Sequence, residues 1–280
     1  RRGMLMLGGK TMMDRNAPAA LCDTAQSAYD DSKALLETWH GRGRAHYVVT
    51  PRFAITSTPA QLEVAGTLRR EHPECHLQTH INENPNEIAL TGELYPDAAH
   101  YLDVYESFGL LGPKTLLGHC IHMTGPEMRV MRETGSVAVF CPTSNLFLGS
   151  GLYDKAGLEG AGIRTAIATD VGGGTSYSML RTLDEGYKIL QLQRQRMHPL
   201  TSFYWITLGN AQALSLAERI GTLQPGSDAD VVVLDARATQ PMALRMETVE
   251  TLSEELFLLQ TLGDDRTVVQ TYAAGTPQKN

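Results

Sequence analysis

Two polar side chains close separate strand-like runs of this sequence, His80 in Thr79-His80-Ile81 and Asp170 in Ala168-Thr169-Asp170. Imidazole and carboxylate groups are good zinc ligands, and a carboxylate can also carry a proton. Glu83 follows His80 by three residues, where it could move protons between a water and a substrate nitrogen. Together these residues predict the metal ligands and the proton shuttle of a barrel hydrolase.

The same residues also have structural explanations. A strand-terminal histidine is often hydrogen-bonded by the backbone, and a lone His-x-x-Glu is a weak signal. Asp170 precedes Gly172, Gly173 and Gly174, so it could cap the next helix or belong to a phosphate-binding loop. The phosphate loop is disfavoured because neither a Gly-x-Gly-x-x-Gly pattern nor a Lys-Ser/Thr pair follows.

Two further groups of chemistry-bearing residues follow strand-like runs. His119 in Gly118-His119 is predicted to be a metal ligand or an electrostatic partner of the attacking hydroxide, whereas His122 is expected in a solvent or core role. Arg52 and Phe53 follow another run; a guanidinium can bind a substrate carbonyl, and an aromatic ring can stack on a planar ligand. A charge pair at the start of a loop explains Arg52 equally well.

Short strand-like runs alternate with helical stretches, a pattern typical of an α/β fold with a parallel sheet. Helix starts are readable at Thr58-Pro59 and Gly125-Pro126, where a capping residue or glycine precedes proline. The predicted strands are residues 3–13, 46–51, 75–80, 115–119, 137–141 and 163–170, and the predicted helices are 60–70, 127–133, 180–195 and 203–217.

The predicted site residues stand at the carboxyl ends of these strands, which ring one mouth in a closed (β/α)8 TIM-type barrel. The segment Cys141-Pro142-Thr143-Ser144-Asn145 joins them there. We therefore predict a barrel, incomplete with about six βα units, over residues 1–218. A second piece, part of a small β domain, is expected over 219–280, with a buried strand at 231–235 and another at 267–272.

Composition and net charge limit the kinds of molecule that the protein is expected to bind and where it is expected to be found. The formal charge of −7 and the pI near 5.7 disfavour a nucleic-acid backbone and favour a small neutral substrate. No apolar window approaches the length of a membrane span, and no signal peptide is expected. The four cysteines form no Cys-x-x-Cys pair, so we expect reduced thiols and a cytoplasmic location.

Six motifs, taken in order along the chain, carry a resemblance to a known family: Gly9-Lys10-Thr11-Met12-Met13-Asp14-Arg15-Asn16, Thr50-Pro51-Arg52-Phe53, Thr79-His80-Ile81-Asn82-Glu83, Gly118-His119, Cys141-Pro142-Thr143-Ser144-Asn145 and Thr169-Asp170-Val171-Gly172-Gly173. They resemble the amidohydrolase superfamily and, within it, the guanine deaminases. The tail Gly221-Thr222-Leu223-Gln224-Pro225-Gly226-Ser227-Asp228-Ala229-Asp230 is similar to the small β domain of that superfamily.

The resemblance implies a zinc-dependent aminohydrolase, commonly a homodimer, that converts guanine to xanthine and ammonia. His80 and Asp170 would ligate Zn2+, and Asp170 would also accept a proton from the attacking water. Glu83 would protonate a ring nitrogen of the purine, and His119 would hold the water or the substrate. Arg52 and Phe53 match the pair that meets the purine.

One feature of the family is absent from the sequence. Its members carry a His-x-His pair at the end of the first barrel strand, and no such pair occurs among the nine histidines here. We expect the chain to start at the third strand, without that pair or the N-terminal half of the β domain, and to bind zinc poorly. The alternatives are another deaminase or chlorohydrolase of the superfamily that acts on an aminated heterocycle, and a non-catalytic fragment.

Overall fold

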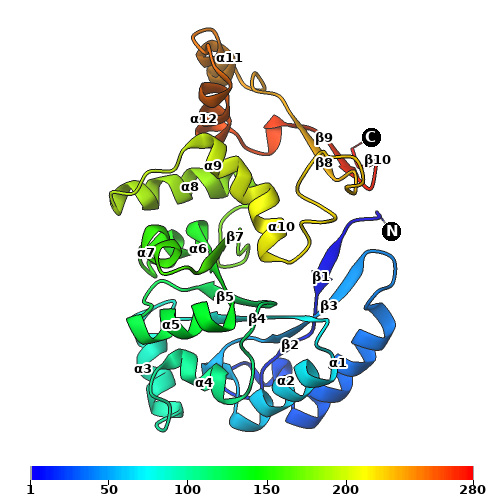
Figure 1. Ribbon diagram of the computed structural model, residues 1–280, viewed down its shortest axis with the longest axis vertical. Coiled ribbons are helices and arrows are strands. Elements are labelled where there is room, and N and C mark those ends of the chain that lie inside the picture. The colour runs from blue at the N-terminus through cyan, green and yellow to red at the C-terminus, as the bar shows by residue number, and fades with distance from the viewer. Residues whose placement is uncertain (1, 280) are drawn as a thin grey trace. The chain divides into compact units, whose positions relative to one another are not determined.

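The computed structural model describes residues 2–279, which form two compact units (Figure 1). The N-terminal unit comprises Met4–Val139 and Leu158–Arg164, and the C-terminal unit comprises residues 2–3, 140–157 and 165–279. None of the helices in residues 2–279 has the length and hydropathy that crossing a bilayer requires. The predicted division at residue 218 stays a prediction.

The N-terminal unit is built on a parallel sheet, as the alternation of strands and helices predicts. Its strands lie in the order β1-β3-β4-β5-β6, with β2 beside β3, and these neighbours pair in parallel. The sheet continues from β6 to β7, a strand whose residues after Arg164 belong to the C-terminal unit. This is the predicted incomplete barrel. The strands are β1 (Met6–Gly8), β2 (Thr11–Met12), β3 (Ala45–Pro51), β4 (His76–Ile81), β5 (Thr115–His119), β6 (Val137–Phe140) and β7 (Arg164–Ile167).

The single strand predicted over residues 3–13 is wrong, because the structure has two short strands there, β1 and β2. Gly9 separates them where the backbone passes against β3, and a Cβ at this position would collide with the carbonyl of Val48. Glycine alone permits so close an approach. Both strands nevertheless pair with β3 in parallel.

Helices cover the sheet of the N-terminal unit, and their starts follow local capping rules. Thr58 accepts a hydrogen bond from Gln61 N and Pro59 is the first residue of α2, as predicted. Thr124 and Glu127 form a capping box at α5, also at a predicted start. The helical segments are η1 (Ala19–Leu21), α1 (Ala25–Trp39), η2 (Ala54–Thr56), α2 (Pro59–Glu71), α3 (Pro85–Leu94), α4 (Tyr101–Ser107), α5 (Gly125–Thr134) and α7 (Lys155–Gly160).

The C-terminal unit combines helices with a small antiparallel sheet of order β10-β9-β8. The predicted helix over 203–217 is interrupted by a π-helical turn, η3, between α9 and α10. Two helices, α11 and α12, fill a stretch for which no element was predicted. The elements are α6 (Pro142–Phe147), α8 (Met179–Leu192), α9 (Pro199–Tyr204), η3 (Trp205–Gly209), α10 (Asn210–Ala213), β8 (Val231–Leu234), α11 (Gln240–Met246), α12 (Leu252–Leu262), η4 (Asp265–Thr267), β9 (Val268–Ala273) and β10 (Thr276–Pro277).

The strand predicted at residues 231–235 exists as β8, but the prediction that it is buried is wrong. Val232 is 55% exposed and Val233 is 42% exposed. The reason is position, because β8 is an edge strand that pairs only with β9 in this sheet. An apolar run therefore predicted the strand correctly and its burial incorrectly.

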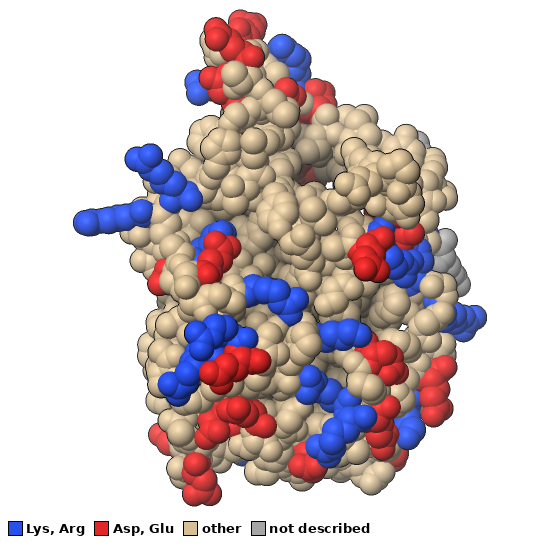
Figure 2. Space-filling model, viewed as in Figure 1, with Lys and Arg blue, Asp and Glu red and all other residues tan. Residues whose placement is uncertain are grey.

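Charged side chains of both signs are interspersed on the face drawn in Figure 2. Many make ion pairs within one helix or between neighbouring helices, such as Arg70 with Glu63 at 2.8 Å and Lys33 with Glu71 at 3.2 Å. Exposed pairs of this kind contribute little to stability, at most about 1 kcal/mol each.

Candidate active site

His80 lies near the end of β4, and its ring is held by the loop that follows β3. The Nδ1 atom is 2.7 Å from the backbone oxygen of Arg52. Because a carbonyl oxygen can only accept, Nδ1–H is the donor, and the lone pair of the neutral ring then sits on Nε2. A histidine fixed by a backbone carbonyl in this way is arranged as metal-ligating histidines are.

His119 and Glu83 lie beside His80 in the same unit. The rings of His80 and His119 are 5.2 Å apart, and His119 Nε2 is 3.7 Å from Glu83 Oε2. The side chain of His119 is 2% exposed and that of Glu83 is 12% exposed. Two imidazoles and a carboxylate thus share a largely dry site at the carboxyl ends of β4 and β5, where ligand binding and proton transfer are both feasible.

Arg52 and Phe53 extend this group of side chains. The Arg52 guanidinium lies over the Phe53 ring, with Cζ 4.7 Å from the ring centroid, and the Phe53 ring is 5.3 Å from that of His80. Arg52 is exposed and Phe53 is half-buried. The N-terminal unit therefore brings together five of the predicted site residues, Arg52, Phe53, His80, Glu83 and His119.

A buried tyrosine, Tyr105 of α4, holds the loop and the strand end together. Its hydroxyl donates to His80 O at 2.6 Å and accepts from Ala54 N at 3.0 Å and from Thr79 Oγ1 at 3.2 Å. Tyr105 is fully buried, and burial raises the pKa of its phenol far above the ordinary value. It is therefore a neutral group that joins the Arg52–Phe53 loop to His80.

A second buried network supports the segment that carries Glu83. Glu87 accepts from Glu83 N at 2.8 Å and from Asn84 N, the latter as part of the capping box of α3. Tyr101 OH donates to Glu87 at 2.7 Å. Burial raises the pKa of Glu87, although these hydrogen bonds oppose that effect. The start of α3 thereby fixes the backbone next to Glu83.

Residues with positive φ concentrate at the strand ends. Asn82 (φ 49°), His119 (φ 73°), Cys120 (φ 50°) and Asp170 (φ 46°) all follow or close a strand of the parallel sheet. For residues other than glycine this conformation costs about 1–3 kcal/mol and is common at functional sites. Asn82 is held there because its side chain donates to the buried Glu127 at 3.0 Å.

Asp170 belongs to the C-terminal unit, on the loop after β7. Its carbonyl accepts from Gly174 N at 2.5 Å, and the carbonyl of Thr169 accepts from Thr143 Oγ1 of α6 at 2.9 Å. A Cβ at Gly174 would collide with Thr169 O. The glycines thus let the loop fold tightly on the segment Cys141–Asn145, which forms the start of α6 rather than an extended loop.

A large groove in the C-terminal unit contains none of the predicted site residues. It has a volume of about 1000 Å³ between α8, α9, α11 and α12, and Arg196, His198, Arg245 and Glu254 are among its lining residues. Its size does not make it the active site, because no strand of the parallel sheet ends in it. The chemistry-bearing residues lie at the strand ends instead.

Comparison with known proteins assigns the chain to a family. The model of the amidohydrolase family matches residues 1–277. The chain belongs to the amidohydrolase family. It is 46% identical to guanine deaminase of Escherichia coli over 97% of this chain and 62% of that protein, and 36% identical to a probable guanine deaminase of Deinococcus radiodurans over 98% of this chain and 63% of that protein. This member of the family therefore spans about three fifths of the length of these curated relatives.

Solved structures give the same assignment. The structure of E. coli guanine deaminase superposes with a TM-score of 0.97 at 45% identity, covering 99% of this chain and 65% of that one. That of C. acetobutylicum guanine deaminase, with bound guanine in its active site, has a TM-score of 0.86 at 27% identity and covers 97% of this chain and 64% of that one. The amidohydrolase fold of this chain is thus close to that of guanine deaminases.

Sequence reasoning missed the residues that position the candidate site. Tyr105, Tyr101 and Glu87 lie in α3 and α4, which were not predicted. For Glu87 a signal was available, because Asn84-Pro85 followed by Glu87 is the pattern of a helix start with a capping box. For Tyr105 no local signal exists, because its partners are 25 to 51 residues away in the chain.

Proposed function

We propose that this amidohydrolase is a guanine deaminase, which hydrolyses guanine to xanthine and ammonia. The similarity to guanine deaminases over nearly the whole chain supports this proposal, as does the guanine bound by the relative from C. acetobutylicum. The observation that carries it is the placement of Arg52 and Phe53 beside His80, since Phe53 lies 5.3 Å from that ring. An aromatic ring for stacking and a guanidinium for hydrogen bonding suit a planar substrate that bears a carbonyl.

The proposed roles of these residues follow from their chemistry. The Arg52 guanidinium donates hydrogen bonds to the carbonyl of guanine, and the Phe53 ring packs against the purine. Glu83 delivers a proton to the ring nitrogen next to the carbon that bears the amine, and then to the departing ammonia. His119, 3.7 Å from Glu83, orients the attacking water or the substrate. Asp170 accepts a proton from that water.

We also propose zinc as the cofactor, held by His80 and Asp170. The residues fit this metal, because the hydrogen bond from His80 Nδ1–H to Arg52 O leaves Nε2 as the ligand atom, and zinc accepts imidazole and carboxylate ligands. These two residues supply half of the four ligands expected in the family. When bound, zinc makes its water acidic enough to react near neutral pH.

The proposal extends to the location of the protein, its metabolic role, its oligomeric state and its partners. No disulfide joins the four cysteines, all of which lie within residues 2–279, and this supports a cytoplasmic location, where thiols stay reduced. Deamination of guanine places the protein in purine catabolism. We propose a homodimer that acts on a small molecule, with neither nucleic acid nor membrane as partner. Light scattering of the purified protein measures its mass in solution and tests the dimer.

Release of ammonia from guanine tests the function. The purified protein, with zinc supplied, is assayed against guanine, adenine, cytosine and an aminated triazine. We expect guanine to be the fastest substrate. The variant Glu83→Gln should lose at least about 100-fold in kcat, the lower end of the usual contribution of a general acid. Asp170→Asn should lose as much.

The matched control is Glu71→Gln, which removes a carboxylate that pairs with Lys33 on the surface of the same unit. We expect its kcat to equal that of the parent. Full turnover by Glu83→Gln would refute the assigned proton shuttle. Faster ammonia release from adenine, cytosine or the triazine than from guanine would move the assignment to another branch of the amidohydrolases.

A further inference from the structure

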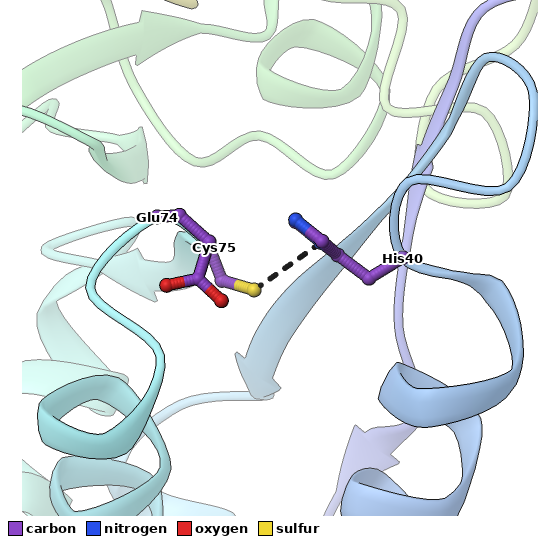
Figure 3. Close-up of side chains that lie close together, drawn as sticks. All are labelled: His40, Glu74 and Cys75. Carbon is purple, nitrogen blue, oxygen red and sulfur yellow. Dashed lines mark hydrogen bonds between the residues drawn. The ribbon is translucent and has the colours of Figure 1, made fainter.

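Three metal-binding side chains meet at the opposite ends of the strands from the candidate active site. His40 directly follows α1, and Glu74 and Cys75 directly precede β4 (Figure 3). All three belong to the N-terminal unit. Cys75 and His80 are five residues apart along the strand, which is about 17 Å at the rise of a β-strand. This cluster is therefore separate from the group around His80 and His119.

The geometry of the cluster suits a small divalent cation. One ligand atom from each of the three side chains lies within 4.8 Å of the other two, and Cys75 Sγ is 3.4 Å from His40 Nδ1. Ligands of one tetrahedral zinc, bound at about 2.0–2.3 Å, lie about 3.5 Å from each other. The sulfur and the nitrogen already have this spacing. The Glu74 side chain is 50% exposed and can swing inward.

Neighbouring residues set the hydrogen bonds and the charge of the side chains in this cluster. A hydrogen bond from its own backbone N–H and the neighbouring His72 lower the pKa of the Glu74 carboxyl group, which favours the charged form that binds a cation. His72 Nδ1 is 3.4 Å from Glu74 Oε1, in the position of an outer group that orients a ligating carboxylate. His40 Nδ1 accepts from Tyr47 N at 3.1 Å, so this nitrogen carries a lone pair rather than a proton. A cation that binds this nitrogen would displace the hydrogen bonds that Tyr47 N–H and the Cys75 thiol make to it.

In the absence of a metal the Cys75 thiol donates a hydrogen bond to His40 Nδ1, since that nitrogen carries no proton. Cys75 is 3% exposed, and burial raises the pKa of its thiol to about 11. A buried, protonated thiol is a poor nucleophile, which argues against covalent catalysis or redox sensing at neutral pH. Coordination is different, because the cation displaces the thiol proton into solvent as the metal–sulfur bond forms.

We propose that His40, Glu74 and Cys75 form a binding site for a zinc-type divalent cation, with a water as the fourth ligand. A set of one thiolate, one imidazole and one carboxylate favours zinc over magnesium or calcium, which prefer oxygen ligands only. The bound cation would tie the end of α1 to the start of β4. Its role would be structural, since it lies at the amino ends of the strands.

Cobalt(II) titration of the metal-free protein tests this site, because a cobalt–thiolate bond gives a charge-transfer absorption in the near ultraviolet that histidine and carboxylate ligands do not give. We expect the absorbance of this band to stop rising once one cobalt ion per chain is bound to a thiolate. The band should disappear when added zinc displaces the cobalt. The variant Cys75→Ala should lose the band. Cys22→Ala, which removes a half-buried thiol elsewhere in the same unit, should keep it.

A second variant keeps the test decisive if Cys75→Ala fails to fold. Glu74→Gln changes a half-exposed side chain. It should lower the affinity for thiolate-bound cobalt at least tenfold, while the circular dichroism spectrum stays that of the wild type. Wild-type protein without the band would overturn the proposal. So would a band that survives in Cys75→Ala, or equal cobalt affinity in Glu74→Gln and the wild type. Ammonia release from guanine plays no part in this readout, so the site is tested independently of the deaminase proposal.

Discussion

Replacing Tyr105 by phenylalanine should destabilise the protein markedly although it removes only one oxygen atom. The hydroxyl donates to His80 O at 2.6 Å and accepts from Ala54 N at 3.0 Å, and both tyrosine and alanine are fully buried. Losing the bond to the carbonyl costs about 0.5–1.5 kcal/mol, and a buried N–H left without an acceptor costs about 1–3 kcal/mol. We therefore expect the free energy of unfolding to fall by about 2–4 kcal/mol.

Urea unfolding followed by circular dichroism measures this change. The matched control is Tyr29→Phe, because the Tyr29 hydroxyl also has two partners, Glu71 at 2.7 Å and Lys33 at 2.9 Å, but at the surface. Water can replace the hydroxyl there, so the control should stay within about 0.5 kcal/mol of the wild type. If Tyr105→Phe also stayed within that range, the claim that Tyr105 fastens the loop to the strand end would be refuted.

Three further predictions concern other buried contacts. Burial raises the pKa of Glu87 above its ordinary value of 4.5. The stability that its protonated form contributes is therefore full below pH 4.5 and is lost as the pH rises through the pKa of the folded state. In urea unfolding at a series of pH values, the midpoint of Glu87→Gln should vary less with pH than that of the wild type. Asn210→Ala removes two hydrogen bonds to the backbone of Ile167, at 3.0 and 2.9 Å, and should cost about 2–4 kcal/mol in urea unfolding, with an unchanged midpoint speaking against this contact. Gly174→Ala, whose Cβ would collide with Thr169 O, should lower the thermal midpoint by several degrees, corresponding to about 1–3 kcal/mol; an unchanged midpoint would mean that the loop relaxes freely.

Local patterns in the sequence were sufficient for the elements that depend on near neighbours. Thr58-Pro59 marked the start of α2 because a capping hydroxyl and a proline act within a single turn. The alternation of apolar strands and helices indicated a parallel sheet, which in turn placed His80 and His119 at neighbouring strand ends. Sequence periodicity is enough for this, because parallel strands joined by helices end at the same edge.

Features that depend on distant partners could not be predicted. The exposure of Val232 follows from the edge position of β8, which is set by the order of strands in the sheet rather than by the apolar run itself. The break between β1 and β2 depends on how closely Gly9 approaches β3. The helices α11 and α12 were missed although local signals exist, because Thr239 caps α11 ahead of a proline and Thr251 forms a capping box with Glu254 at α12.

The sequence by itself determined the fold class, the family and the residue types available for chemistry, because motif spacing and hydrophobic alternation are properties of the chain. Only the tertiary structure decided which nitrogen of His80 is the donor, since Arg52 O lies 28 residues away along the chain. It also decided that His40 meets Cys75, 35 residues later. Such pairings depend on how helices and strands pack, and packing joins residues that no local pattern connects.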